Sequence, residues 1–246
     1  MAHFSNGLTA LVTGAGRAEG IGFEVCRQLC AKGYRVFLTA RSPDSARMRA
    51  GELTAEGFDA RPLALDVSSA DSVAAAVRVV AEAGCLDILV NNAATTSAYG
   101  EKASTADLGA AHSAFESIIF GAWRTFQAFL PLLRLSPAAR VVNVSSGAGS
   151  HGDPVFGLTS GNGMGPGYAV AKAALNALTA AAAYELKDTP ILVNAVCPGF
   201  TATFPGGEAM GARPVRDGAA GVVWAATLSA GGPSGGFFRD GAPLPW

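Results

Sequence analysis

Cysteine and histidine are scarce in this sequence, with four cysteines and three histidines among 246 residues. No two cysteines form a C-x-x-C pair, and no histidine stands near one at the spacing of metal ligands. Cys26 and Cys30 are one helical turn apart, which is compatible with a metal pair, but a core-facing stripe of buried thiols is the simpler interpretation. We therefore expect no metal site.

Charge is also sparse, at 15% of the residues with a formal net charge of -1. Such a chain has no basic face for a nucleic acid backbone, so we do not expect nucleic acid as a ligand. Long hydrophobic runs are missing too, because Glu116 and Arg124 interrupt the apolar segment 115–133, and no membrane span is predicted. Residues 1–7 lack a basic region followed by an apolar stretch, so no secretory signal is predicted and a cytoplasmic location is expected.

Apolar residues make up half of the sequence, which is enough to bury one large core, and we expect a single domain over 1–246. Short apolar runs alternate with segments of helical periodicity. Strands are predicted over 8–13, 34–40, 59–65, 86–91, 138–145 and 190–196, and helices over 21–32, 42–56, 69–83, 105–134, 166–187 and 214–229. This alternation predicts an α/β fold with a doubly wound, Rossmann-type parallel sheet and helices on both faces.

A glycine-rich turn follows the first predicted strand and opens the first predicted helix. It reads Thr13-Gly14-Ala15-Gly16-Arg17-Ala18-Glu19-Gly20-Ile21-Gly22. Glycines let the backbone approach a pyrophosphate, while the helix N-terminus supplies amide donors and partial positive charge. Glycines also simply make turns, but this position between strand and helix favours a dinucleotide site.

The second predicted strand ends at Thr39-Ala40-Arg41, without an acidic residue. An acid in this region binds the ribose hydroxyls of NAD, whereas an arginine favours the 2′-phosphate of NADP. Arg17 could hold the same phosphate from the other side. The alternative is that Arg17 and Arg41 are both solvated surface residues.

Tyr168 and Lys172 are four residues apart on a predicted helix, so their side chains share one face. A nearby lysine cation stabilises phenolate and brings a tyrosine into a useful acid/base range. Such a tyrosine can give a proton to a carbonyl oxygen as a hydride arrives, or take it back. The spacing alone is also common in surface helices.

The remaining motifs occur in an order that, with the glycine turn and the Tyr-x-x-x-Lys pair, resembles the short-chain dehydrogenase/reductase family across nearly the whole chain. They are Leu65-Asp66-Val67, Asn91-Asn92-Ala93-Ala94, Val142-Asn143-Val144-Ser145-Ser146 and Asn194-Ala195-Val196-Cys197-Pro198-Gly199. The strand end Leu38-Thr39-Ala40-Arg41 and the closing Gly235-Gly236-Phe237-Phe238-Arg239-Asp240-Gly241 are most similar to the NADPH-dependent carbonyl reductase branch.

The resemblance implies an oxidoreductase that transfers hydride between NADP(H) and a ketone or alcohol. In it, Tyr168 is the acid/base, Ser146 holds the substrate oxygen, and Lys172 binds the nicotinamide ribose and tunes Tyr168. The other cofactor contacts that it implies are Gly14, Gly16, Arg17, Gly20, Ile21, Arg41, Asp66, Val67, Asn92, Ala93, Ala94, Pro198, Gly199, Thr201 and Thr203. Family members often pair through the helices matching 105–134 and 166–187, so a homodimer or homotetramer is expected.

The chain departs from the family pattern at three places. Two additional residues separate Thr13-Gly14 from Gly20, which favours a longer phosphate loop, although Gly16, Gly20 and Gly22 also satisfy the glycine spacing. Ala94 replaces a glycine of the family. Ile118 stands where the family has an asparagine that helps seat a water joining lysine to solvent. This last change leaves open an enzyme of another class, such as a dehydratase, isomerase or cyclase.

The loops expected to meet substrate are 95–103, 147–166 and 200–213. Their apolar residues predict an apolar pocket and include Tyr99, Val155, Phe156, Leu158, Met164, Phe200, Phe204 and Met210. His151 and Asp153 are candidates for a polar contact or for a solvated loop pair. A nonenzymatic dinucleotide sensor is disfavoured, because Ser146, Tyr168 and Lys172 are all present.

Overall fold

The computed structural model describes residues 6–95, 100–160 and 165–246. Within these ranges one sheet of eight strands has the order β3-β2-β1-β4-β5-β6-β7-β8, parallel throughout except for the pair β7 and β8. The strands are β1 (Thr9–Val12), β2 (Arg35–Ala40), β3 (Ala60–Ala64), β4 (Ile88–Asn91), β5 (Arg140–Val144), β6 (Leu192–Val196), β7 (Phe237–Arg239) and β8 (Ala242–Pro243).

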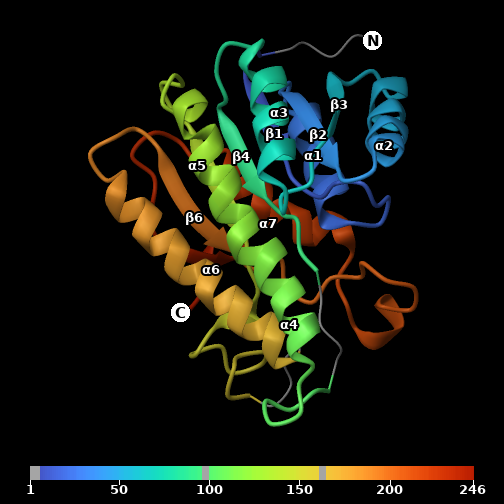
Figure 1. Ribbon diagram of the computed structural model, residues 1–246, viewed down its shortest axis with the longest axis vertical. Coiled ribbons are helices and arrows are strands. Elements are labelled where there is room, and N and C mark those ends of the chain that lie inside the picture. The colour runs from blue at the N-terminus through green and yellow to red at the C-terminus, as the bar shows by residue number, and fades with distance from the viewer. Residues whose placement is uncertain (1–5, 96–99, 161–164) are drawn as a thin grey trace.

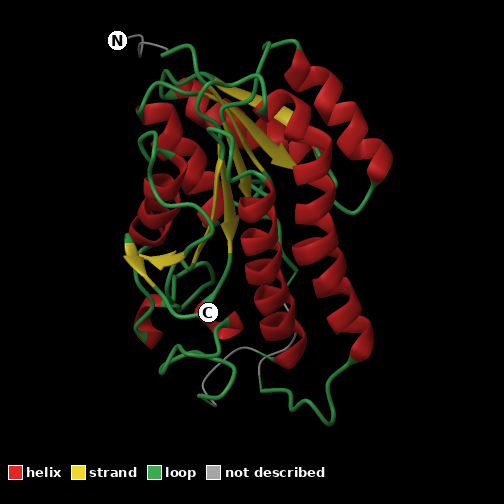
Figure 2. Ribbon diagram, turned by 90° about the vertical axis from the view of Figure 1, so that its left-hand side faces the viewer, coloured by secondary structure: helices red, strands yellow, loops and turns green. Residues whose placement is uncertain are grey.

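Helices cover both faces of the sheet (Figures 1 and 2). They are α1 (Ile21–Ala31), α2 (Pro43–Ala55), α3 (Ala70–Ala81), α4 (Leu108–Phe115), α5 (Gly121–Leu133), α6 (Pro166–Glu185) and α7 (Val215–Ala226). Alternate strand residues point to opposite faces. Ala10 and Val12 of β1 therefore join a core with α1, α2 and α7, whereas Leu11 joins a second core with α3, α5 and α6.

Local sequence signals explain where several helices begin. Ser42, Ser69 and Asp107 precede α2, α3 and α4, and each side chain accepts a hydrogen bond from a backbone N–H of the first turn. Pro43 and Pro166 occupy the first turn of α2 and α6, where a missing N–H costs nothing. Most of the predicted elements therefore start within three residues of their observed positions.

The predicted doubly wound parallel sheet with helices on both faces is confirmed. Strands β7 and β8 were not predicted, because three- and two-residue strands carry too little pattern to be recognised. The single helix expected over 105–134 is wrong in detail: a π-helical turn, Glu116–Phe120, separates α4 from α5. Cys26 and Cys30 are both buried in the core, as expected, and no helix in the described ranges is long and apolar enough to cross a membrane.

Candidate active site

A cleft of about 710 Å³ lies at the carboxyl ends of the parallel strands. Its walls include residues one or two positions beyond β1, β4 and β6, namely Gly14, Asn92 and Pro198. The sheet order reverses between β1 and β4, and open α/β sheets bind ligands at such a switch point. The cleft therefore occupies the position expected of an active site.

The glycine turn forms one wall of this cleft. Gly14 lies two residues beyond β1 and has φ +69°, and a Cβ atom there would lie 2.7 Å from the Cα atom of Ala93. Asn92 fixes the same turn, since its Nδ2 donates to the Thr13 carbonyl at 2.8 Å. A side chain at Gly22 would overlap Asn92 Nδ2. The structure thus places Thr13-Gly14 at the strand end and leaves a longer loop before α1.

The N-terminus of α1 faces the cleft, which Gly16, Gly20 and Ile21 line. Gly20 is the N-cap residue, and no side chain caps this end of the helix. The first amide N–H groups of a helix lack intrahelical acceptors and carry partial positive charge. This end of α1 can therefore hold an anionic group such as a pyrophosphate.

Two arginines line the cleft, Arg17 beside the glycine turn and Arg41 beyond β2. Arg17 Nη2 donates to the Thr203 carbonyl at 2.5 Å and so joins the turn to the segment after β6. Arg41 is exposed and stands with Ser42 and Ser45 at one end of the cleft. Arg41 thus offers a cation, and the serines offer hydroxyl groups, to an anion bound there.

Asp66 and Val67 line the cleft beyond β3. The Ser68 hydroxyl donates to Asp66 Oδ1 at 2.6 Å, and this bond is the largest of the effects that hold the pKa of the Asp66 carboxyl below its usual range. Val67 packs on Gly121, where a side chain would overlap it. Ala93 and Ala94 line the cleft from the segment after β4. The structure thus brings these residues to one cleft, and their contacts with a cofactor stay a prediction.

Tyr168 and Lys172 line the cleft from α6, as their four-residue spacing predicts. Lys172 is only 3% exposed, its Nζ donates to the Val144 carbonyl at 2.6 Å, and Nζ lies 5.4 Å from the centre of the Tyr168 ring. Burial lowers the pKa of Lys172 to about 8. The pair therefore places a buried amine near a phenol ring at the cleft.

In the protein without cofactor, the free energy of unfolding is expected to depend on pH through the protonation of Lys172. Because the pKa of Lys172 falls from 10.5 to about 8, the unfolded chain binds more protons between these pH values. The free energy of unfolding should therefore rise with pH across this window, by about 3 kcal/mol relative to Lys172→Met. Urea titrations of both proteins from pH 7 to 11 measure the difference, and parallel curves would contradict the assignment.

The two serines at the end of β5 have different surroundings. Ser145 is buried, and its hydroxyl donates to Asn176 Oδ1 at 2.5 Å, which ties β5 to α6. Ser146 is half-buried on the turn that follows, and its Oγ accepts the Ala148 N–H at 3.2 Å. Ser145, rather than Ser146, is among the residues that line the cleft. Ser146 stands immediately beyond this lining, at the start of the loop that leads to Tyr168.

The segment after β6 is only partly at the cleft surface. Pro198 and Thr203 line it, whereas Gly199 and Thr201 are not among the lining residues. Gly199 has φ +76°, and Thr201 donates its hydroxyl to the Pro198 carbonyl at 3.1 Å. These two residues shape the turn that presents Pro198 and Thr203.

Ile118 lies in the π-helical turn and is 1% exposed. It packs in a cluster with Ala171 and Leu175 of α6 and does not line the cleft. Its neighbour Ser117 does line the cleft, and Ser117 Oγ accepts the Thr95 N–H at 3.0 Å. The residue at the family's asparagine position therefore belongs to the contact between two helices.

Aromatic residues connect the two loops expected on the substrate side. The Phe200 ring centre lies 6.3 Å from those of Phe156 and Phe204. Val155 and Met210 are exposed, and Tyr99 and Met164 lie outside the described residues. Phe156, Phe200 and Phe204 are not among the residues that line the cleft, so the apolar pocket stays a prediction.

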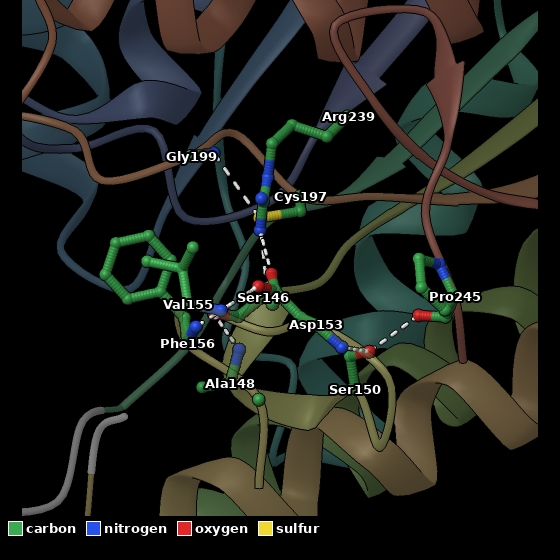
Figure 3. Close-up of polar contacts among 12 residues, drawn as sticks. Ser146, Ala148, Ser150, Asp153, Val155, Phe156, Cys197, Gly199, Arg239 and Pro245 are labelled. Carbon is green, nitrogen blue, oxygen red and sulfur yellow. Dashed lines mark hydrogen bonds and ion pairs between the residues drawn. The ribbon is translucent and has the colours of Figure 1, made fainter. Parts of the chain in front are cut away.

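Asp153 is neither a solvated loop residue nor a partner of His151. Its side chain is fully buried and forms an ion pair with Arg239 of β7, as Figure 3 shows. From the sequence alone, Arg239 is only one residue of the closing motif. The signal that could have found it is a charged residue in an otherwise apolar terminal strand, Phe237-Phe238-Arg239.

Comparison with known proteins agrees with this geometry. Residues 8–210 match the family model for short chain dehydrogenase. The chain belongs to the short-chain dehydrogenase family. Similar proteins include the short-chain dehydrogenase anuI of Penicillium roqueforti, 34% identical with 88% of this chain and 87% of that protein covered. (-)-Isopiperitenone reductase of Mentha piperita is also 34% identical, with 95% and 96% covered.

A solved structure of NADPH-bound carbonyl reductase from chicken fatty liver is similar to this short-chain dehydrogenase over its whole length. The two are 27% identical, with a TM-score of 0.84 and coverage of 99% of this chain and 100% of that chain. The sequence resemblance to the carbonyl reductase branch is thus accompanied by a similarity of fold.

Proposed function

We propose that this short-chain dehydrogenase reduces an apolar ketone to an alcohol with NADPH, or catalyses the reverse oxidation. The observation that carries the proposal is the Tyr168–Lys172 pair, which lines the same cleft as the glycine turn and the open N-terminus of α1. A phenol beside a buried cation suits proton transfer to a carbonyl oxygen. The NADPH-bound carbonyl reductase of similar fold supports the choice of cofactor.

The cleft residues fit a dinucleotide. Glycine at positions 14 and 22 lets the turn pack closely on Ala93 and Asn92, and the N-terminus of α1 offers amide donors to a pyrophosphate. Asp66 and Val67 would hold the adenine end, and Lys172 the nicotinamide ribose. Arg41, with Ser42 and Ser45, would hold the 2′-phosphate that distinguishes NADPH from NADH.

NADPH supplies the hydride, and the residues of the chain supply the proton. Ser146 donates a hydrogen bond to the ketone oxygen and holds it in place. Tyr168 transfers its hydroxyl proton to that oxygen, so that the alcohol leaves with one proton from the protein. Lys172 stabilises the tyrosinate that remains until a solvent proton replaces the one transferred.

The test of this function compares NADPH and NADH as cofactors with a panel of apolar ketones. We expect alcohol formation in proportion to NADPH consumed and a kcat/KM at least about tenfold higher with NADPH, because one charge-assisted bond to the 2′-phosphate is worth about 1.5–3 kcal/mol. NADPH binding with no turnover of any carbonyl would instead favour another reaction class.

Arg41→Asp is expected to narrow or reverse the preference for NADPH. The substitution removes the cation and places a carboxylate beside the phosphate, while NADH has no phosphate to repel. The ratio of kcat/KM for the two cofactors is the measurement. Arg78→Asp is the matched control, because Arg78 is exposed on α3 and does not line the cleft. An Arg41 variant that keeps the parental ratio would remove Arg41 from the phosphate site.

A further inference from the structure

An ion pair between a buried carboxylate and a partly buried guanidinium joins the loop that follows Ser146 to β7. The Asp153 side chain is fully buried, and Arg239 Nη2 donates to its Oδ2. Two N–H groups of the same guanidinium also point at the Cys197 sulfur, from Nε at 3.4 Å and from Nη2 at 3.3 Å (Figure 3). One side chain of β7 therefore contacts both the loop after β5 and the segment after β6.

Asp153 fixes the conformation of its own loop. Its Oδ1 accepts the backbone N–H groups of Val155 at 2.9 Å and Phe156 at 3.1 Å. The Arg239 guanidinium carbon lies 6.0 Å from the centre of the Phe156 ring, which is itself 6.3 Å from the Phe200 ring centre. The ion pair thus sets where Phe156 stands on the substrate side.

The Asp153 carboxylate stays ionised in this setting. Burial raises the pKa of the carboxyl group, but hydrogen bonds from the Val155 N–H and the Arg239 guanidinium outweigh burial and lower the pKa overall. The charges of the pair are therefore retained across the pH range in which the protein would work.

Cys197 fixes the other side of the arrangement. Its sulfur accepts the Gly147 N–H at 3.1 Å and the Gly199 N–H at 3.4 Å. Gly147 follows Ser146 directly, and Gly199 shapes the turn that presents Pro198 and Thr203 to the cleft. The Cys197 sulfur thus accepts hydrogen bonds from the Arg239 guanidinium and from the backbone of both segments, the loop after Ser146 and the turn after β6.

The ion pair packs against the backbone of Gly147, the residue that follows Ser146. A Cβ atom at Gly147 would overlap both Arg239 Nη2 and Asp153 Oδ2, so the pair packs on the backbone next to Ser146. Farther along the loop, the Ser150 hydroxyl donates to the Pro245 carbonyl at 2.6 Å and the His151 N–H to the Trp246 carbonyl at 2.8 Å. The segment that follows β7 and β8 therefore holds the loop at a second place.

We propose that Arg239 is a positioning residue that acts on two segments of the site through a single guanidinium. Through Asp153 and Phe156 it positions the loop 147–160, which we call the substrate wall. Through Cys197 it positions the segment after β6, which we call the cofactor wall. This inference rests on the proposed reductase function. The Arg239 side chain is partly exposed, and neither surface nor buried ion pairs contribute much net stability. The value of the pair here is geometric, because a planar guanidinium can hold two acceptors at fixed directions.

The contacts predict a different kinetic signature for each variant. Arg239→Met should raise both the KM for an apolar ketone and the Kd for NADPH about tenfold, since small displacements of positioned groups have large kinetic costs. Asp153→Asn should raise the ketone KM about tenfold but keep the NADPH Kd within about twofold, because the Asp153 side chain binds Arg239 and its own loop, whereas the contact with Cys197 is made by Arg239. Arg239→Lys should fall between the parent and Arg239→Met, because one ammonium cannot reach both acceptors with fixed geometry.

Asp59→Asn is the matched control. Asp59 also pairs with an arginine, Arg35, and is partly buried, but it precedes β3 at the edge of the sheet away from the cleft. Its kinetic constants should equal those of the parent. Thermal melting of every variant identifies any that fails to fold, in which case Arg239→Lys supplies the comparison.

Amide hydrogen exchange separates this inference from the proposed function. Exchange in 153–157 should be faster in both Asp153→Asn and Arg239→Met, and exchange in 197–203 should be faster in Arg239→Met alone. If the parent protein has no reductase activity, the proposed function is overturned. The exchange rates in 153–157 and 197–203 then still decide whether Arg239 holds both segments in place. An active parent whose Arg239→Met variant keeps both constants and both exchange rates overturns the inference alone.

Discussion

Replacing Tyr168 by phenylalanine is expected to lower kcat for ketone reduction by about 10²- to 10⁴-fold, the usual contribution of a positioned acid. The phenylalanine ring keeps the packing that Tyr168 makes against the cluster of Ile118, Ala171 and Leu175. The Kd for NADPH should therefore change little. Single-turnover rates beside a fluorescence titration of NADPH measure the two quantities separately.

The same helix provides the control for this experiment. Tyr184 lies near the end of α6, is 72% exposed and has the Lys187 ammonium 4.6 Å from its ring centre. It is thus a tyrosine beside a lysine on α6, but far from the cleft lining. Tyr184→Phe should keep parental rates. If Tyr168→Phe also keeps them, Tyr168 is not the acid and the proposed mechanism fails.

Features that depend on neighbouring residues were predictable from the sequence. The glycine turn needs a strand before it and a helix after it, and both are encoded within about twenty residues around Gly14 and Gly20. The Tyr168–Lys172 pair follows from helical geometry, because residues four apart share a face. The alternation of apolar runs and amphipathic segments was sufficient to predict strands β1 to β6 and the two helical layers.

Features that depend on distant residues were not predictable. Asp153 and Arg239 are 86 positions apart, and β7, which carries Arg239, has only three residues. Whether Asp153 is solvated or buried depends on which strand returns beside its loop, and a single sequence does not encode that in any local pattern. The difference between Ser145 and Ser146 likewise depends on Asn176, whose amide oxygen accepts the Ser145 hydroxyl.

The π-helical turn changes how the departure at Ile118 is interpreted. From the sequence, a hydrocarbon at the asparagine position suggests an altered route for returning a proton to Tyr168. In the structure, Ile118 points into the contact between its own helix and α6, while Ser117 and Glu116 line the cleft. The extra residue of a π turn shifts which side chains face a neighbour. A relay role and a packing role for this position therefore predict opposite results for one substitution.

Ile118→Asn is expected to destabilise the fold by about 3 kcal/mol or more without raising turnover. The substitution removes a buried aliphatic side chain and places a polar amide in a cluster of apolar side chains. Ile118→Val, which keeps an apolar side chain, should cost only about 0.5–1.5 kcal/mol. Urea unfolding of both variants measures the difference. A relay position predicts instead that Ile118→Asn raises kcat and reduces the solvent deuterium isotope effect. Both kinetic quantities, measured below the unfolding transition, therefore decide whether Ile118 is a packing residue or the missing member of a proton path.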